Sequence, residues 1–345
     1  MSSELVPPTA HTSIESVLDV QQHTALQRLL SAQSLWVTVA LIIICVVMGV
    51  WQPASFATSE NFYNITRNFS FIGIMALGMT AVIATGGIDL SVGSTMGLTA
   101  VACGLTLEAG YPWWAAVAVG LAAGGVVGLI NGIIIAYVGL SPFVTTLGML
   151  SIARSCAVVL SGNRMLYNFG PGGAVFKTLG AGAINIGPSF QASYPLVFLC
   201  VLTAILALVY KFSGWGRHVL AIGGNEQAAL LTGVPVKRVK AQVYVVSGLA
   251  AAFAAILDVG WSGSAINALG ASYELLAISA AVIGGANLMG GEASAYGALV
   301  GAALIYVIRN ALLMAGIDSN WQGTFVGLFL ISAVYLGKVR GAKRE

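Results

Sequence analysis

The chain has 345 residues, of which 58% are hydrophobic and only 8% are charged. Soluble domains carry roughly 25% charged residues, so this composition excludes an ordinary soluble protein and predicts an all-α polytopic membrane protein. The net charge of +3 is small and the basic residues lie near the ends of apolar runs, which indicates topology signals and argues against a nucleic-acid-binding surface.

Residues 1–34 are mostly polar and lack the basic and apolar regions of a secretory signal peptide, so we expect no cleaved segment. Thr12 and Glu15 fit a capping box, and apolar residues recur at helical spacing through the segment. Two interpretations stay open: an amphipathic cytoplasmic helix on the membrane surface, and a frayed tail.

Ten apolar runs each come close to the roughly 20 residues that a helix needs to cross a bilayer. They cover residues 35–51, 65–84, 89–108, 113–137, 142–161, 193–211, 240–260, 273–288, 293–313 and 320–337. Together they define a transmembrane domain over residues 35–340, with a short tail at 341–345. An even number of spans places both termini on the same side of the membrane.

The distribution of basic residues predicts which side that is. With the amino terminus in the cytoplasm, ten of the fifteen Lys and Arg residues fall in cytoplasmic segments. Basic residues concentrate on the cytoplasmic side of membrane proteins, so we expect both termini to be cytoplasmic.

Two glycine-rich segments interrupt the apolar runs, GGIDLSVG at 86–93 and GGANLMGG at 284–291. We expect a tight re-entrant turn or a helix end at the cytoplasmic side in each of them. The segments align without gaps, with glycines matching at the first, second and last positions. That match has two interpretations: a parallel internal repeat, or chance in a chain with 43 glycines.

Polar residues in or beside the spans are candidates for a pathway or gate: Asp89, Ser91, Asn131, Arg154 and Asn287. Asp89 has a competing structural role, because its carboxylate can cap the third span through the backbone N–H of Ser91 or the next residue. Arg154 needs a partner, either Asp89 or backbone carbonyl groups, because a buried guanidinium costs at least about 2.5 kcal/mol. Asn131 has the alternative role of joining two helices by a hydrogen bond.

Three features on the predicted outer side of the membrane concern the docking of a partner or the entry of a solute. Residues 162–192 form the longest outer segment, and a loop of that length is usually functional or disordered, so it is a candidate docking surface. Asp258 and Glu274 flank a later outer loop, where we expect exposed rim carboxylates; the alternative is an entry vestibule or a contact for a basic partner. Arg309 and Asn310 are expected to extend to the membrane interface.

The cytoplasmic loop at 212–239 is strongly basic and contains the signals of a short helix. Asn225 can cap its N-terminus, Glu226 places a negative charge in its first turn, and Gly233 and Pro235 can end it. A helix of about eight residues is only about 12 Å long, so it cannot cross the bilayer and lies at the membrane surface. We expect it to dock on a soluble motor protein; the alternative is an ordinary surface loop.

Several kinds of chemistry have no signal in the sequence. There is no phosphate-binding-loop motif, no intramembrane series of Asp, Glu and His for proton relay, and no catalytic constellation. The four cysteines lie in apolar runs without C-x-x-C spacing and the three histidines are scattered, so we expect neither disulfides nor a metal site. The sequence predicts a transmembrane pathway that is not an enzyme and has no energy source of its own.

Three motifs in this order carry a family resemblance: GGIDLSVGS at 86–94, GRHVLAIGGNEQAALLTGVPVKRVK at 216–240 and YELLAISAAVIGGANLMGG at 273–291. They closely resemble the permease subunits of ATP-binding cassette importers for ribose and related monosaccharides, and the resemblance covers about residues 35–340. The chain departs from the family at Ser319, Asn320 and Trp321, where relatives often have Asn-Pro-Tyr. That departure leaves the exact substrate open.

The resemblance implies a bacterial inner-membrane permease that imports a pentose or hexose. Its implied partners are a cytoplasmic ATP-binding cassette subunit, which would hold the ATP and Mg, a periplasmic sugar-binding protein, a second identical or related permease, and membrane lipid. It also implies an ATPase-coupling helix with the interface residues Asn225, Glu226, Gln227, Ala228, Ala229, Leu230 and Gly233. Two alternatives are an ion-gradient-driven secondary solute transporter and a sensor subunit that moves no solute.

Overall fold

The computed structural model describes residues 32–187, 190–321, 323–325, 327–328 and 331. The first half of the chain forms α3 (Gln33–Trp51), α4 (Ser59–Ala84), α5 (Val92–Glu108), α6 (Trp113–Ile133), its π-helical extension η1 (Ile134–Val138) and α7 (Pro142–Ser161). The second half forms α8 (Gly172–Ala181), strands β1 (Ala183–Ile186) and β2 (Phe190–Ser193), α9 (Tyr194–Phe212), α10 (Gly214–Gly224), α11 (Glu226–Leu231), α12 (Val236–Ser262), α13 (Tyr273–Ile283), α14 (Ala295–Met314) and the 3₁₀ turn η2 (Ser319–Trp321).

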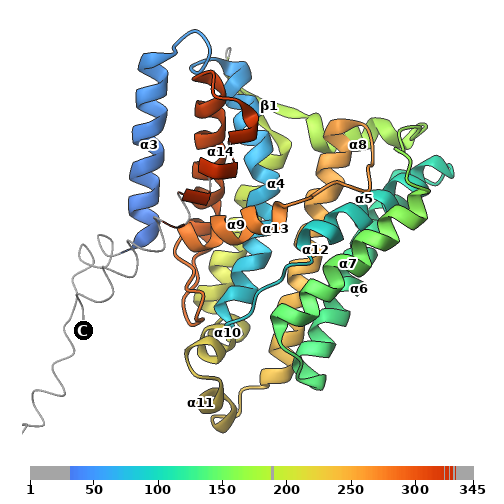
Figure 1. Cartoon of the computed structure of the whole chain (residues 1–345), viewed down its shortest axis with the longest axis vertical. Coiled ribbons are helices and arrows are strands. Elements are labelled where there is room, and N and C mark those ends of the chain that lie inside the picture. The colour runs from blue at the N-terminus through green and yellow to red at the C-terminus, as the bar shows by residue number, and fades with distance from the viewer. Residues whose placement is uncertain (1–31, 188–189, 322, 326, 329–330, 332–345) are drawn as a thin grey trace, which may run out of the picture.

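The long helices form a bundle with two distinct ends (Figure 1). Helices α10 and α11 lie at one end, here called the α11 end, and α8 and the β1–β2 hairpin lie at the other, the α8 end. On one side α14 stands between α3 and α4 and contacts both. On the other side α5, α6 and α7 pack together, and α12 joins the two groups because it contacts both α4 and α6.

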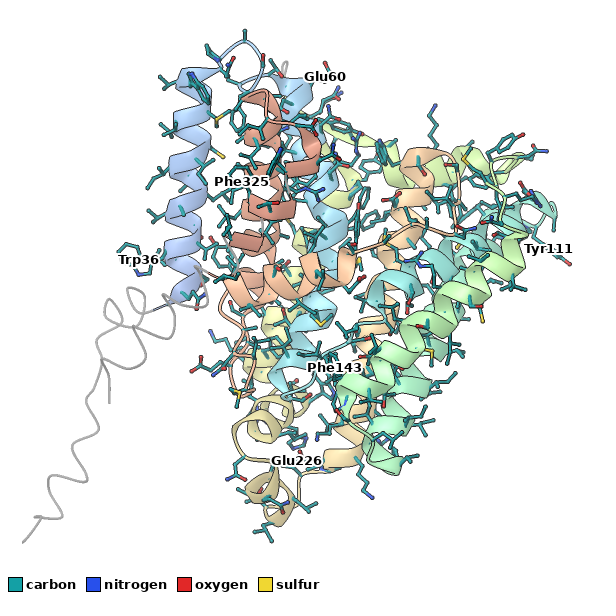
Figure 2. The ribbon with its side chains drawn as sticks, viewed as in Figure 1. Trp36, Glu60, Tyr111, Phe143, Glu226 and Phe325 are labelled. Atoms are coloured by element: carbon teal, nitrogen blue, oxygen red, sulfur yellow. The ribbon has the colours of Figure 1, made fainter. Side chains whose placement is uncertain are left out.

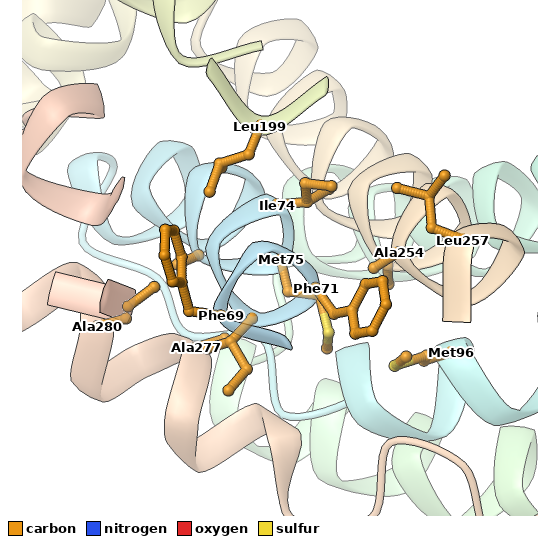
Figure 3. Packing of buried hydrophobic residues seen from close by; sticks show 14 of the residues in the cluster. Phe69, Phe71, Ile74, Met75, Met96, Leu199, Ala254, Leu257, Ala277 and Ala280 are labelled. Atoms are coloured by element: carbon orange, nitrogen blue, oxygen red, sulfur yellow. The ribbon is translucent and has the colours of Figure 1, made fainter. Parts of the chain in front are cut away.

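Helix α4 is the centre of the bundle. Its N-terminus is fixed by Thr58, whose side chain accepts a hydrogen bond from the backbone N–H of Asn61. Every residue from Phe69 to Ala84 is buried. Figure 3 shows Phe71 and Met75 of this helix among apolar side chains of α5, α9, α12 and α13. Because lipid is as apolar as these side chains, close packing, and not the hydrophobic effect, holds such a bundle together.

Small residues allow α6 and α12 to approach backbone to backbone. Gly124, Gly128 and Gly132 recur every four residues on the face of α6 that meets α12. A Cβ atom at Gly128 would clash with the carbonyl oxygen of Tyr244, and one at Gly124 would clash with that of Gly248. The glycine content noted in the sequence therefore serves helix packing at these positions.

Most of the predicted spans are present in the structure. Among the described residues, seven helices are long and apolar enough to cross a membrane: α3, α4, α6 with η1, α7, α9, α12 and α14. They correspond to the first, second, fourth to seventh and ninth predicted spans, so the prediction of an all-α polytopic membrane protein is confirmed. The third span is α5, which has 17 residues and starts at Val92. Residues 1–31 and most of the predicted last span lie outside the described residues.

The prediction of a full eighth span at 273–288 is wrong. Helix α13 has 11 residues, about 16 Å of helix, and Figure 1 shows it lying across the long helices. It ends at Ile283 because Gly284 packs so closely against Gly297 of α14 that a Cβ atom would clash, and because Gly285 has a φ of 105°. The apolar run continues past this break, which is why the sequence suggested one longer helix.

The segment at 162–192 contains regular structure where the sequence suggested a loop. Helix α8 packs on α12 with Gly180 against the backbone at Leu257, and β1 pairs antiparallel with β2, Ala183 opposite Ser193. Arg164 donates a hydrogen bond of 2.8 Å to Glu108, which raises the pKa of Arg164. These contacts fix the segment over the α8 end of the bundle.

Candidate functional site

Helix α11 has the local signals that the sequence predicted. The side chain of Asn225 accepts a hydrogen bond of 3.0 Å from the backbone N–H of Ala228, and Glu226 lies in the first turn. Gly233 follows with a φ of 84°, a conformation that suits glycine. The helix spans six residues, about 9 Å, so it is somewhat shorter than expected.

Helix α11 exposes two leucines beside the polar side chains of Glu226 and Gln227. Leu230 is 58% exposed and Leu231 is 88% exposed, at the extreme end of the molecule where Figure 2 labels Glu226. Glu226 itself accepts a hydrogen bond of 2.6 Å from Lys240, which holds α11 to the first turns of α12. Two exposed leucines on a helix beside a charged surface suit contact with another protein.

Three segments far apart in the sequence meet at the end of α10, directly before α11. This contact is here called the glycine junction, and its residues are Gly86, Gly223, Gly290 and Gly291. The backbone N–H of Gly291 donates a hydrogen bond of 3.0 Å to the carbonyl oxygen of Ala84, at the end of α4. A Cβ atom at Gly223 would clash with that same carbonyl group and with Gly291. The end of α10, directly before α11, is therefore in backbone contact with the bundle core.

The two aligned glycine segments meet in this junction but do not share a conformation. Gly86 has a φ of 78° whereas its aligned partner Gly284 has a φ of −67°. At the next position Gly285 has a φ of 105° and Gly87 has no positive φ. Each segment directly follows the end of a helix, α4 at Ala84 and α13 at Ile283, as expected, but the glycines at the first two aligned positions differ in backbone conformation.

Asp89, Ser91 and Asn131 come together in one buried polar cluster. The Oδ1 atom of Asp89 accepts hydrogen bonds from the backbone N–H of Ser91 at 3.0 Å and from its Oγ at 2.6 Å. The other carboxylate oxygen accepts one from Ser247 of α12 at 2.8 Å, and Asn131 of α6 donates one to Ser91 at 2.9 Å. All four residues are buried, so the cluster joins α5, α6 and α12 and does not line an open channel.

Arg154 and Asn287 lie apart from that cluster. The Arg154 guanidinium donates to the backbone carbonyl oxygens of Asn267, Leu269 at 3.0 Å and Gly93 at 3.4 Å, so its partners are carbonyl groups and not Asp89. Asn287 is exposed in the turn after α13, where its side chain accepts a hydrogen bond from Met289 at 3.0 Å. The five candidates therefore do not form a single site.

The expectation of an exposed carboxylate at Asp258 is wrong, because the residue is only 4% exposed. Helix α12 continues to Ser262, so Asp258 lies a full turn inside it, where it interacts electrostatically with the buried Arg67 of α4. Sequence reasoning missed this pair, although position 258 falls within a predicted span and a charge there was a signal. Within the described residues no three His, Cys, Asp or Glu side chains gather as a metal site would require.

The family model described as "Branched-chain amino acid transport system / permease component" matches residues 61–334. The probable ABC transporter permease protein y4mJ of Sinorhizobium fredii is 37% identical over 88% of this chain and 89% of its own length. The galactose/methyl galactoside import permease protein MglC of Salmonella typhimurium is 33% identical, over 89% and 94%. The autoinducer 2 import system permease protein LsrD of the same species is 38% identical, over 78% and 80%. No solved structure matches the chain.

Proposed function

We infer that this chain, which belongs to the family of permease components of ATP-binding cassette importers, moves a monosaccharide or a similar polyhydroxylated solute across the membrane. It is a transport subunit and not an enzyme, since ATP hydrolysis belongs to a separate subunit in such importers. Support for the solute class comes from the import permeases for galactose and for autoinducer 2, each at least 33% identical to it. An ion-gradient-driven transporter has no comparable support.

Helix α11 is the proposed coupling helix, with the ATPase contacts on Asn225 to Leu230 and on Gly233. Its capped structure and exposed leucines support this role, because a coupling helix must hold its shape while it lies in a cleft of another protein. The α11 end would then face the cytoplasm. Exposed basic residues at this end favour that orientation: Lys211, Arg217, Lys237 and Arg238.

The other proposed partners are a periplasmic solute-binding protein at the α8 end and a second permease, identical or related, beside this one in the bacterial inner membrane. The regular structure of α8, β1 and β2 within this part of the chain supports the first, because a fixed surface binds a partner at lower entropic cost than a mobile loop. In the proposed cycle, ATP binding moves the coupling helices, the permease pair opens outward to receive the solute, and hydrolysis restores the inward-facing state.

The first experiment is to purify the tagged chain from its native membrane in mild detergent and to identify its partners by intact-complex mass spectrometry. Recovery of an ATPase chain with two permease chains is the expected result. Proteoliposomes of that complex, with ATP inside and the binding protein outside, should then accumulate labelled galactose or ribose. Accumulation of neither sugar would contradict the solute class, and uptake without ATP would contradict the importer mechanism.

A further inference from the structure

Two opposite charges are buried in the half of the bundle nearer the α8 end. Arg67 of α4 is 8% exposed and Asp258 of α12 is 4% exposed, in a chain where charged residues are scarce. Both lie within long apolar helices. Ionisable side chains inside the membrane are costly, so their presence indicates either a strong structural pair or a functional site.

Arg67 is held by aromatic rings and not by hydrogen bonds. Its guanidinium lies 4.3 Å from the ring centre of Trp261 and 5.2 Å from that of Tyr63. Its Nε atom is buried without a hydrogen-bond partner, and among the described residues no acceptor is bonded to its other nitrogens. Ring faces stabilise a guanidinium but leave its in-plane N–H donors unused.

Asp258 is likewise without a direct partner among the described residues. Its carboxylate lies close enough to Arg67 for an electrostatic interaction, but the pair is not within the 4.0 Å of an ion pair, and no hydrogen bond reaches Asp258 from any described residue. A carboxylate that is 4% exposed and receives no hydrogen bond is unfavourable. A structural pair would be expected to close to direct contact, and this pair does not, so both charged groups keep hydrogen-bonding capacity for a ligand.

The surroundings of the pair limit which kind of ligand it could bind. Tyr273 of α13 and Tyr306 of α14 interact electrostatically with Asp258 and Arg67 respectively, so four helices converge on the pair. Trp261 is 40% exposed, which gives the cluster an open edge. Arg309 of α14 acts electrostatically on both tyrosines as well. A cation would be repelled by Arg67 and Arg309, an anion would have to lie against Asp258, and an apolar solute would leave the charged groups without hydrogen bonds.

We propose that Arg67, Asp258 and Trp261 form a solute-binding site for a neutral polyhydroxylated compound on its way through the permease. Asp258 accepts hydrogen bonds from hydroxyl groups, Arg67 donates to hydroxyl or ring oxygens, and the ring of Trp261 packs on an apolar face of the sugar. The inference rests on the proposed sugar-import function and deepens it, because it places solute contact on this chain and not on the binding protein alone.

The test uses the assembled transporter in proteoliposomes, with galactose and ribose as probes and two readouts: sugar uptake and binding-protein-stimulated ATP hydrolysis. Asp258→Asn and Arg67→Gln should each lower sugar uptake about tenfold while ATP hydrolysis stays within about twofold of the wild type. The matched control is Glu60→Gln, which removes an exposed carboxylate from the first turn of α4, and it should take up sugar as the wild type does.

A double variant separates binding from a merely structural pair. If the two charges form only a structural ion pair, replacing both by apolar residues, Arg67→Met with Asp258→Leu, often leaves the stability of the protein unchanged. Sugar uptake should stay low in this variant if the charges bind solute. Recovery of uptake, or normal uptake in both single variants, would overturn the proposal.

Trp261 gives a second route if the charge variants fail to assemble. Trp261→Phe keeps an aromatic face and should retain most uptake, whereas Trp261→Ala should lose it; equal uptake by the two would also overturn the proposal. If the wild type accumulates neither probe, the sugar-import function itself fails and this inference fails with it. Wild-type uptake with unaffected variants would overturn only the site.

Discussion

Asp89 is buried in an apolar protein, yet both of its carboxylate oxygens accept hydrogen bonds from the protein. The backbone N–H and Oγ of Ser91 and the Oγ of Ser247 are its three donors. The cluster thereby ties the turn after α4 to α12, and through Asn131 to α6. We propose that the cluster fixes the helices around the turn, because all four of its residues are buried.

Removing the Asp89 carboxylate should therefore cost more than removing one of its donors. Asp89→Ala leaves three buried donors unpaired and should lower the free energy of unfolding by about 3 kcal/mol, whereas Ser247→Ala should cost about 1 kcal/mol. Thermal unfolding in detergent, followed by tryptophan fluorescence, measures both. Equal melting temperatures for the two variants would show that the carboxylate is not the centre of the cluster.

At the scale of single residues, the sequence predicts the hydrogen bonds between residues that are close together in the chain. The hydrogen bond from the backbone of Ser91 to Asp89 spans two residues, so the capping pattern was enough to expect it. The bond from Ser247 spans 158 residues and depends on how α12 packs, which no local pattern contains. For Arg154, desolvation cost predicted that a partner exists but not which carbonyl groups supply it.

At the scale of elements, the glycine junction connects α10 to the core, and Gly223 allows the contact. Gly223→Ala would drive a Cβ atom into the carbonyl group of Ala84 and should reduce binding-protein-stimulated ATP hydrolysis at least about fivefold by displacing α10 and α11. Gly224→Ala is the matched control, since its Cβ atom would meet nothing within 4 Å. Similar ATP hydrolysis in both variants would remove the junction from the coupling route.

The α6–α12 contact makes a second prediction about glycine. Gly128→Ala places a methyl group against the backbone of Tyr244 and should cost about 1–3 kcal/mol of stability. Gly125→Ala, on the same helix, meets only the Leu249 side chain at 3.4 Å and should leave the melting temperature unchanged or raise it, because alanine favours helix by roughly 0.5–1 kcal/mol. A larger loss in Gly125→Ala would contradict this account of the packing.

Elements with strong end signals were predictable and elements set by packing were not. Helix α11 follows from Asn225, Glu226 and Gly233, each of which acts within a turn of its own position. Helix α13 and its end at Ile283 depend on the approach of Gly284 to α14, and an apolar run says nothing about whether its helix crosses the membrane or lies across other helices. The β1–β2 hairpin was missed because it likewise has no strong end signals in the sequence.

At the scale of the whole molecule, two helices connect the proposed solute site with the proposed ATPase contact. Helix α4 carries Arg67 and ends at the glycine junction, and α12 carries Asp258 and begins beside α11, to which Lys240 binds it. A displacement of α10 and α11 would therefore act on both charged residues through rigid helices. The two helices form a continuous physical connection between the proposed solute site and the proposed ATPase contact. The Gly223 and Gly224 variants test whether a change at one of these sites affects the other.

The same arrangement predicts that the ATPase contact can be lost without damage to the bundle. Leu231 is 88% exposed, so Leu231→Asp should leave expression and thermal unfolding of the permease unchanged. It should nevertheless abolish copurification of the ATPase chain, because a carboxylate would have to be desolvated in the apolar contact. Tyr111→Ser replaces another exposed side chain, labelled at the opposite end in Figure 2, and should retain the ATPase. If Leu231→Asp retains it as well, α11 is not the docking helix, and the exposed Met289 beside the glycine junction becomes the next surface to test.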